Sequence, residues 1–269
     1  MLIVAKAGGT VVKNGLSEIA KDAKDLVEGG GNLIFVHGGG VEVTQIAEKL
    51  GKKQSFVISP EGFRSRYTDL ETVEILNMVM SGKINKGVVS AFQSQGVRSV
   101  GLSGVDGFLL KAKRKEKMII VDERGRKRVA DAGYSGKVYQ VNDGLLKLLI
   151  ANGYVPVVSP VAIGEEFELL NVDGDRAAAS IAGALKADKL IFLTDVDGVI
   201  LDGRLVREIK VSEIRDVLPK IGSGMSTKVH AALEALEMGV KEAIIASGLC
   251  KSPILSALKH ENGTVIVRG

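Results

Sequence analysis

Cysteine and aromatic residues are scarce in this sequence. Its 269 residues include one cysteine, Cys250, no tryptophan and 4% aromatic residues. A single cysteine excludes an internal disulfide, so we expect a reducing, cytoplasmic location and a small packed residue at Cys250 rather than a catalytic thiol. With so few aromatic rings, a stacking surface for single-stranded nucleic acid is not expected, and we predict no nucleic-acid partner.

Long apolar runs are also missing. No stretch approaches the roughly 20 apolar residues of a membrane-spanning helix, and the run at residues 2–5 is too short for a secretory signal. We therefore expect no membrane association. The net charge of +4 and the pI of about 9.0 favour an anionic partner without identifying it.

Short apolar segments alternate with helical patterns such as those at residues 17–28 and 41–50. Strands separated by helices require crossover connections, so we predict an α/β fold, a three-layer αβα sandwich with a largely parallel central sheet. The predicted strands are apolar without alternation, as strands covered on both faces should be. They are residues 2–5, 32–36, 99–102, 155–158, 189–193 and 243–246.

Two segments interrupt this alternation. Residues 52–66 contain a Ser-Pro-Glu-Gly turn between short β-prone pieces, which predicts a hairpin. Residues 111–137 are rich in Lys and Arg around the β-prone run 118–121, and we predict a second hairpin there.

Glycine-rich turns follow the first two predicted strands. Lys6 precedes Gly8 and Gly9, and this combination offers a cation and backbone N–H donors to an anion. A surface lysine at an ordinary turn fits the pattern equally well. The run 37–40 (His-Gly-Gly-Gly) lets the backbone approach a phosphate or carboxylate, although its spacing is not that of a dinucleotide-binding fingerprint. His37 is expected to be a packed, hydrogen-bonded residue rather than a base.

A third glycine-rich turn, at residues 222–228, is not a Walker A loop, because Thr227 stands where glycine should precede Lys228. We expect it to place Lys228 in the first turn of a helix, where it either binds phosphate or is simply exposed.

Acidic residues follow two later segments. The run 171–175 (Asn-Val-Asp-Gly-Asp) is not a calcium-binding EF-hand loop, since alanine occupies the twelfth position in either register. Helix capping is the alternative role for Asp175. The run 194–199 ends a predicted strand and could be a turn.

Taken together and in order, these motifs resemble the amino-acid kinase family, essentially from end to end. The sequence is most similar to the N-acetylglutamate kinase branch, and within it to kinases that phosphorylate aminoadipate or glutamate carried on the small protein LysW. The motifs are Lys6-Ala-Gly-Gly, His37-Gly-Gly-Gly, Arg66-Tyr-Thr-Asp, Asn171-Val-Asp-Gly-Asp, Leu193-Thr-Asp-Val-Asp-Gly and Gly224-Met-Ser-Thr-Lys.

The resemblance implies a role for each matched residue. Lys6 and Lys228 would hold the transferring phosphoryl group from two sides, with Asp175 between them. Arg66 and Asn171 would bind the backbone-side carboxylate of the acceptor, and Tyr67 would also belong to the substrate-binding site. The backbone amides of Gly8, Gly9, Gly39 and Gly40 would face the phosphates and the attacking carboxylate. The expected nucleotide site consists of Thr194, Asp195, Gly198, Gly222 and Met225.

The expected chemistry needs no general base, because a carboxylate is already a nucleophile at neutral pH. ATP would bring Mg²⁺ on its phosphates, and no metal site on the protein is expected. By the resemblance, residues 1–170 would form the acceptor-binding and dimerisation half, residues 171–269 would form the ATP-binding half of one continuous sheet, and the chain would be a homodimer. The chain starts directly at a strand, so we expect no arginine inhibition of the kind that uses an N-terminal helix.

Two features favour a carrier-linked acceptor over a free one. Tyr67 replaces the small aliphatic residue usual in N-acetylglutamate kinases. Basic residues also gather on the two predicted hairpins, at 111–117, 124–128, Lys52, Lys53, Arg64 and Arg66. Such a surface would steer an acidic amino-group carrier protein. The alternatives are N-acetyl-L-glutamate kinase of arginine biosynthesis and a non-catalytic, nucleotide-responsive binding protein.

Overall fold

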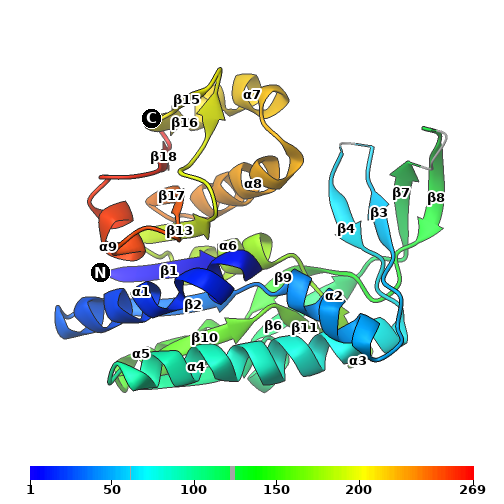
Figure 1. The fold of residues 1–269 in the computed structure, drawn as a ribbon, viewed down its shortest axis with the longest axis horizontal. Coiled ribbons are helices and arrows are strands. Elements are labelled where there is room, and N and C mark those ends of the chain that lie inside the picture. The colour runs from blue at the N-terminus through cyan, green and yellow to red at the C-terminus, as the bar shows by residue number, and fades with distance from the viewer. Residues whose placement is uncertain (61, 122–124) are drawn as a thin grey trace.

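The structure is a computed structural model that describes residues 1–60, 62–121 and 125–269, and over these residues eight strands form one central sheet. Their order is β16-β18-β17-β13-β1-β2-β10-β5, and of the neighbouring pairs only β17–β18 is antiparallel (Figure 1). The strands are β1 (Leu2–Ala7), β2 (Asn32–His37), β5 (Ser99–Ser103), β10 (Val155–Ser159), β13 (Lys189–Thr194), β16 (Glu208–Lys210), β17 (Glu242–Ser247) and β18 (Thr264–Val267).

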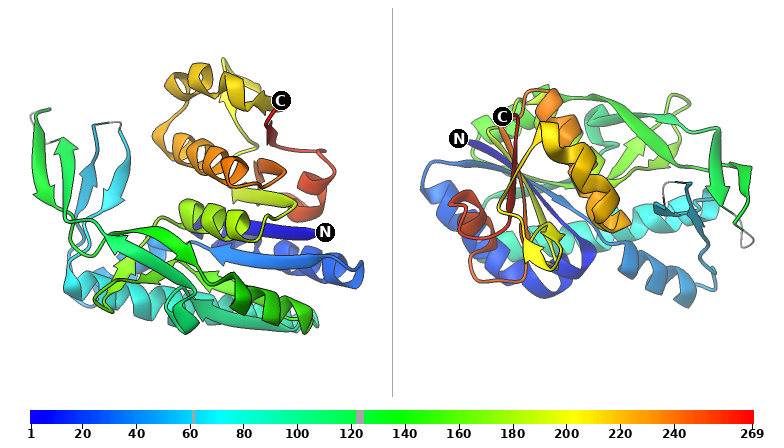
Figure 2. Two further views of the ribbon diagram at one scale, coloured as in Figure 1. Left: turned by 180° about the vertical axis from the view of Figure 1, so that it is seen from behind. Right: turned by 90° about the horizontal axis from the view of Figure 1, so that it is seen from above.

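Helices cover both faces of this sheet (Figure 2). One face carries α1 (Gly9–Glu28), α2 (Gly40–Lys49), α3 (Leu70–Asn77), α4 (Asn85–Ser94) and α9 (Pro253–Leu258), with a π-helical segment, Met78–Ile84, joining α3 to α4. The other face carries α5 (Asp143–Ala151), α6 (Gly174–Ala184), α7 (Ile214–Val217) and α8 (Ser223–Glu237). The predicted three-layer αβα sandwich is confirmed.

The two-sided cover explains the apolar runs of the strands. In β1, Ile3 and Ala5 belong to the core under α1, whereas Val4 belongs to the core under α6. Both faces of the strand are therefore buried, and no polar alternation is possible.

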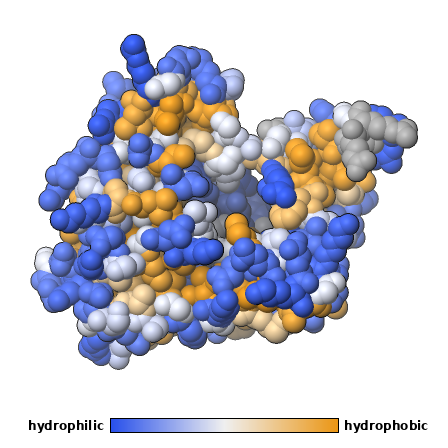
Figure 3. Space-filling model, viewed as in Figure 1, coloured by the Kyte–Doolittle hydropathy of each residue, from blue (hydrophilic) through white to orange (hydrophobic). Residues whose placement is uncertain are grey.

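Smaller sheets project from the central one. A four-stranded sheet has the order β12-β11-β6-β9, and two hairpins, β3–β4 and β7–β8, stand next to each other opposite α7 and α8 (Figure 1). The space-filling view shows a hollow between these hairpins and the body (Figure 3). The strands are β3 (Phe56–Ile58), β4 (Arg64–Arg66), β6 (Leu110–Arg114), β7 (Lys117–Val121), β8 (Lys127–Asp131), β9 (Gly136–Val141), β11 (Val161–Ile163), β12 (Leu169–Asn171), β14 (Ile200–Leu201) and β15 (Arg204–Leu205).

Two predictions need correction. The segment 111–137 is not one hairpin, because β6 pairs with β9 outside the β7–β8 pair. The first helix starts at Gly9 rather than near residue 17, and it packs so closely that a Cβ on Gly15 would lie 2.3 Å from the carbonyl oxygen of Gly248. Within the described part of the chain, no helix is both long and apolar enough to cross a membrane.

Candidate active site

Two lysines and one aspartate form a buried ion cluster near the carboxyl ends of β1 and β13. Nζ of Lys6 lies 2.7 Å from Oδ1 of Asp175, and Nζ of Lys228 lies 3.0 Å from Oδ2 of the same carboxylate. Asp175 is only 5% exposed and Lys6 only 8%. One carboxylate therefore positions two ammonium groups, and the cluster keeps one positive charge in excess.

The electrostatics favour the charged forms of this cluster. Burial alone would lower the pKa of Lys6, but the neighbouring carboxylate of Asp175 outweighs burial and raises the pKa of Lys6 above its usual value. Burial would raise the pKa of Asp175, and the two ammonium charges reverse that, leaving the pKa of Asp175 below its usual range. Lys6 and Asp175 are therefore both charged at neutral pH.

Local structure explains how Asp175 reaches the lysines. Lys6 is the penultimate residue of β1, so the strand runs further than predicted. Asp173 caps α6, since its Oδ1 accepts a hydrogen bond from the backbone N–H of Arg176 at 2.9 Å. The suggestion that Asp175 is the helix cap is therefore wrong. Asp175 lies in the first turn of α6, where the helix dipole stabilises its negative charge.

Lys228 also lies deeper in its helix than predicted. Helix α8 begins at Ser223, with Gly222 at its N-cap, so Lys228 belongs to the second turn and not to the first. Residues 223–226 suggested a turn because Gly and Ser are weak helix formers, yet they form the first helical turn.

The glycine turns after β1 and β2 pack tightly together. A Cβ on Gly9 would lie 3.1 Å from Cα of Gly39, and a Cβ on Gly39 would lie 2.1 Å from Cδ1 of Ile84. The N–H of Gly8 donates to the carbonyl of Leu193 at 3.2 Å, so this amide already has a partner. Gly9 and Gly40 are the first residues of α1 and α2, where amides are left without helical acceptors.

His37, at the end of β2, is fully buried. Its Nδ1 lies 3.2 Å from the carbonyl oxygen of Gly38, and its Nε2 lies 3.2 Å from Nδ2 of Asn85. The carbonyl can only accept and the amide can only donate, which assigns the neutral tautomer protonated at Nδ1. Burial lowers the pKa of His37 to about 4. The prediction of a packed, hydrogen-bonded histidine is confirmed.

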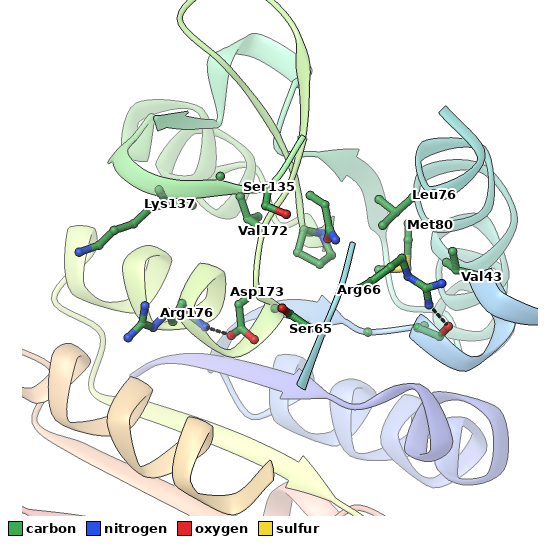
Figure 4. Close-up of a pocket in the computed structure, with 18 of the residues that line it drawn as sticks. Val43, Ser65, Arg66, Leu76, Met80, Ser135, Lys137, Val172, Asp173 and Arg176 are labelled. Carbon is green, nitrogen blue, oxygen red and sulfur yellow. Dashed lines mark hydrogen bonds between the residues drawn. The ribbon is translucent and has the colours of Figure 1, made fainter. Parts of the chain in front are cut away.

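A cavity of about 380 Å³ opens from Lys6 toward the hairpins. Figure 4 shows Arg66 on one side of it, near Val43, Leu76 and Met80, and Lys137 and Arg176 on the opposite side. Glycines 38–40 and residues 171–174 also line it. The cavity therefore brings Lys6, Arg66 and Asn171 to one space, as the sequence motifs suggested.

Arg66 is held firmly in this cavity. One terminal nitrogen, Nη2, donates to the carbonyl of Gly40 at 2.7 Å and to Oγ1 of Thr44 at 2.9 Å, and Nη1 donates to Gln54. Burial, and then the charge of Arg64, lowers the pKa of Arg66. No carboxylate pairs with Arg66 among the described residues, so its charge is available to an anionic ligand.

Asn171 and Tyr67 differ in their relation to this cavity. Nδ2 of Asn171 donates to Oγ1 of Thr68 at 3.0 Å, which orients the side chain at the wall. Tyr67 is not one of the residues that line the cavity. Its ring faces Gly133, where an added Cβ would lie 3.6 Å from Cε2 of Tyr67.

The amino-acid sequence matches the model of a known protein family. Residues 1–247 match the model described as "Amino acid kinase family". The chain belongs to the amino acid kinase family. Among curated relatives, the "[LysW]-aminoadipate/[LysW]-glutamate kinase" of Sulfolobus acidocaldarius is 45% identical over 266 residues, covering 98% of this chain and 100% of the relative. The protein of the same name from Saccharolobus solfataricus is 45% identical over 269 residues, covering 100% of both chains.

Solved structures of other proteins share the fold. N-acetylglutamate synthase from Neisseria gonorrhoeae, complexed with coenzyme A and N-acetyl-glutamate, superposes with a TM-score of 0.82 at 25% identity, and this chain spans 59% of its length. Carbamate kinase from Giardia lamblia bound to AMP-PNP superposes with a TM-score of 0.69 at 18% identity, covering 99% of this chain and 98% of that one. At 18% identity, the second likeness concerns the fold alone.

The expected nucleotide residues lie apart from the cavity that contains Arg66. Thr194 ends β13, and its Oγ1 donates to Oδ1 of Asp195 at 3.2 Å. Gly198 has φ +148°, and a Cβ there would lie 2.7 Å from Oγ1 of Thr264, so packing alone accounts for this glycine. Gly222 caps α8, and Met225, in the first turn, packs against the core.

The basic residues predicted on the hairpins are not equally available to contact an anionic partner. Nζ of Lys52 lies 2.7 Å from carboxylate oxygens of both Asp69 and Glu71, so Lys52 adds little to a basic surface. Arg114 lies on β6, where its Nε donates to the carbonyl of Gly133 at 2.8 Å. Lys117 and Lys127, on β7 and β8, are exposed. Arg124 falls outside the described residues.

Several residues that line the cavity were not predicted from sequence, among them Lys115, Lys137 and Arg176. Lys115 and Lys137 stood within a predicted basic segment, where one lysine could not be told from another. Their placement depends on the β6–β9 pairing, which only the fold reveals.

Proposed function

We propose that this protein transfers the γ-phosphate of ATP to the side-chain carboxylate of aminoadipate or glutamate carried on an amino-group carrier protein. The observation that carries the proposal is the Lys6–Asp175–Lys228 cluster, whose Lys6 lines the same cavity as Arg66. Kinase relatives at 45% identity over nearly the whole chain, named for these two substrates, support it.

The chemistry is an in-line displacement at phosphorus. A carboxylate oxygen of the acceptor attacks the γ-phosphorus of ATP, the bond from that phosphorus to the β–γ bridging oxygen breaks, and ADP leaves with the electron pair. The product is an acyl phosphate. The barrier comes mainly from bringing two anions together, so groups that neutralise charge on the transferring phosphoryl are worth several kcal/mol.

Each residue has a share in this reaction. Lys6 and Lys228 stabilise the phosphoryl group, and Asp175 holds their ammonium groups in place. Arg66, with Asn171 beside it, binds the carboxylate near the blocked amine, so that the other carboxylate points toward Lys6. The free amides at the start of α1 and α2 bind phosphate oxygens. Residues 1–170 thus supply most of the acceptor site, with Asn171 beside it, and residues 171–269 bind the rest of the nucleotide.

Magnesium is expected with the nucleotide. The oxygens of Asp175 face Lys6 and Lys228, which leaves this carboxylate unsuited to ligate a metal directly. A Mg²⁺ ion bound by the ATP phosphates fits such a site and would neutralise phosphate charge. Asp175 then acts on the lysines and not on the ion.

The amine of the acceptor must be blocked for a chemical reason. A free amine would attack the activated acyl phosphate and cyclise the product. A carrier blocks the amine and also offers a surface to recognise. The exposed Lys117 and Lys127 next to apolar Ile119 and Val129, which are 54% and 68% exposed, form a surface suited to an acidic carrier.

The test is direct detection of the acyl phosphate. Carrier-linked aminoadipate is incubated with enzyme and ATP in the presence of hydroxylamine, which converts an acyl phosphate to a hydroxamate. Hydroxamate formed in proportion to ADP supports the proposal. ADP released without hydroxamate would refute it. The expected homodimer, formed through the N-terminal half, stays a prediction.

A further inference from the structure

Two polar side chains, His37 and Asn85, are fully buried behind the second glycine turn and do not line the cavity. His37 ends β2, and Asn85 begins α4. Nδ2 of Asn85 lies 3.2 Å from Nε2 of His37. The same nitrogen donates to the backbone carbonyls of Val157, at 2.9 Å, and Leu102, at 3.2 Å. Asn85 therefore connects His37 to β10 and β5 and holds its ring in one orientation.

This pair contributes little to stability by itself. The four residues that precede His37 in β2 are apolar and equally buried. Burial removes the hydration of a polar group, and hydrogen bonds inside the protein mostly restore what is lost. Replacing both partners by apolar groups of similar shape is therefore often nearly neutral. An imidazole bonded to an amide needs another reason at this position.

The peptide between Gly38 and Gly39 is the part of the site that this pair controls. Glycine has the freest backbone of all residues, so a peptide plane flanked by two glycines turns easily. Nδ1 of His37 donates to the carbonyl oxygen of Gly38 at 3.2 Å, and this hydrogen bond fixes the plane. The C=O and N–H of a planar trans peptide point in opposite directions. The N–H of Gly39 is therefore directed away from the buried imidazole.

The N–H of Gly39 is free to bind a ligand. Gly39 lines the cavity together with Lys6, and none of the described residues accepts a hydrogen bond from this N–H. A Cβ on Gly39 would lie 2.1 Å from Cδ1 of Ile84, so no other residue fits here without a shift. The turn thus has no side chain of its own that could fix the amide.

We propose that His37 is a positioning residue that, oriented by Asn85, holds the N–H of Gly39 toward the phosphoryl group during its transfer. The inference rests on the proposed function, because it takes the glycine turn beside Lys6 as the place where phosphate oxygens bind. Asn85 donates to Nε2 and thereby keeps the proton on Nδ1, where it is needed for the carbonyl of Gly38. Burial lowers the pKa of His37 to about 4, against the hydrogen bond to Gly38 and together with the charge of Lys6. The ring therefore stays neutral at pH 7.

The tautomer of His37 is measured by ¹⁵N NMR. The chain has three histidines, His37, His230 and His260, and the signals lost in His37→Gln are those of His37. We expect a neutral ring with its proton on Nδ1 in the wild type at pH 7. A proton on Nε2 would overturn the inference, because the carbonyl of Gly38 would then face a lone pair. This measurement uses the wild type and does not depend on the folding of any variant.

Substitutions of His37 connect the hydrogen bond to catalysis. His37→Phe keeps a ring but removes the donor. It should lower kcat for hydroxamate formation from carrier-linked aminoadipate about tenfold, less than the roughly 100-fold effect of deleting a donor to the transition state. The Kd of ATP should change far less, since the contact is strongest during transfer. His37→Gln, whose amide can donate to Gly38 and accept from Asn85, should recover much of the lost kcat.

Asp22→Ala is the matched control for buried polar side chains. Asp22 is 1% exposed, and its Oδ2 accepts hydrogen bonds from two backbone N–H groups at the start of α9. Its loss should lower the melting temperature, as the loss of a helix cap does, and leave kcat unchanged. The control separates a positioning role from a general loss of stability.

The outcomes distinguish this inference from the proposed function. An unchanged kcat in His37→Phe, or an equal fall of kcat in Asp22→Ala, would overturn the positioning role while wild-type enzyme still forms hydroxamate. Loss of ATP binding in His37→Phe without loss of kcat would also overturn it, since the amide would then serve the ground state. No hydroxamate from the wild type would refute the proposed function and this inference with it, whatever the tautomer of His37.

Discussion

The ammonium group of Lys6 lies 2.7 Å from a carboxylate oxygen of Asp175, and both side chains are almost fully buried. A buried ion pair is costly to desolvate, and removing one partner leaves an uncompensated charge. Such a pair is a poor device for stability alone. It is well suited to hold a cation where a phosphoryl anion will arrive.

Asp175→Asn should separate catalysis from folding. We expect kcat to fall about 100-fold, because the lysines lose the charge that orients them, while the protein stays folded with a lowered melting temperature. Asp173→Ala is the matched control in the same helix turn. Loss of that cap should lower the free energy of unfolding by about 1 kcal/mol. Unfolding of the Asp175→Asn variant, or an unchanged kcat, would contradict the assigned role.

The two lysines should act mainly in the transition state. Lys6→Ala and Lys228→Ala should each lower kcat by about 100-fold or more, with a much smaller change in the Kd of ATP. Single-turnover kinetics and ATP titration measure the two quantities separately, and Lys259→Ala serves as the control. A variant that loses ATP binding and keeps kcat would show that its lysine binds the ground state.

His37 predicts a pH dependence of stability. Burial lowers its pKa to about 4, against 6.5 in the unfolded chain, so the unfolded state binds the extra proton between these values. The contribution of neutral, buried His37 to the free energy of unfolding is fully present above pH 6.5. It is lost as the pH falls toward 4, by about 3 kcal/mol in total.

Urea denaturation at pH 7.0 and 4.5 measures this loss. Comparison with His37→Gln removes the background from carboxylates that titrate in the same range. The variant should show a shallower decline than the wild type. Parallel declines would mean that the buried imidazole does not resist protonation.

Charge reversal should affect the carrier reaction only. Lys117→Glu combined with Lys127→Glu should lower kcat/KM for carrier-linked aminoadipate about tenfold at low salt, because these exposed residues steer an acidic partner. The Kd of ATP should not change. Lys24→Glu with Lys259→Glu, on α1 and beyond α9 at the opposite end of the molecule, applies the same change of charge as a control (Figure 1). Equal effects of the two double variants would exclude local steering.

Much of the fold could be predicted because burial on both faces leaves a plain sequence signal. The runs at residues 2–5, 33–36 and 190–193 are apolar throughout, and each lies in a strand of the central sheet. Helix starts were less visible. Gly9 and Ser223 begin α1 and α8 within glycine-rich stretches whose helical propensity is low, and packing against the sheet decides their structure.

The site could be predicted only in part. Motif order placed Lys6, Asp175 and Lys228 in one family pattern, but no spacing rule indicates that Asp175 contacts both lysines while Asp173 caps the helix. Lys115 and Lys137 could not be distinguished from other lysines of a basic segment, because strand pairing alone brings them to the cavity. Nothing in the sequence around Lys52 indicated that it forms ion pairs with Asp69 and Glu71.

One comparison tests the central claim most directly. The purified enzyme is assayed with Mg-ATP and either carrier-linked aminoadipate, carrier-linked glutamate or free N-acetylglutamate, and kcat/KM is measured at low and at physiological salt. We predict that the carrier-linked acids are preferred by orders of magnitude and that their kcat/KM falls as salt screens the hairpins. Rapid phosphorylation of N-acetylglutamate, with no gain from the carrier and no salt dependence, would contradict the account.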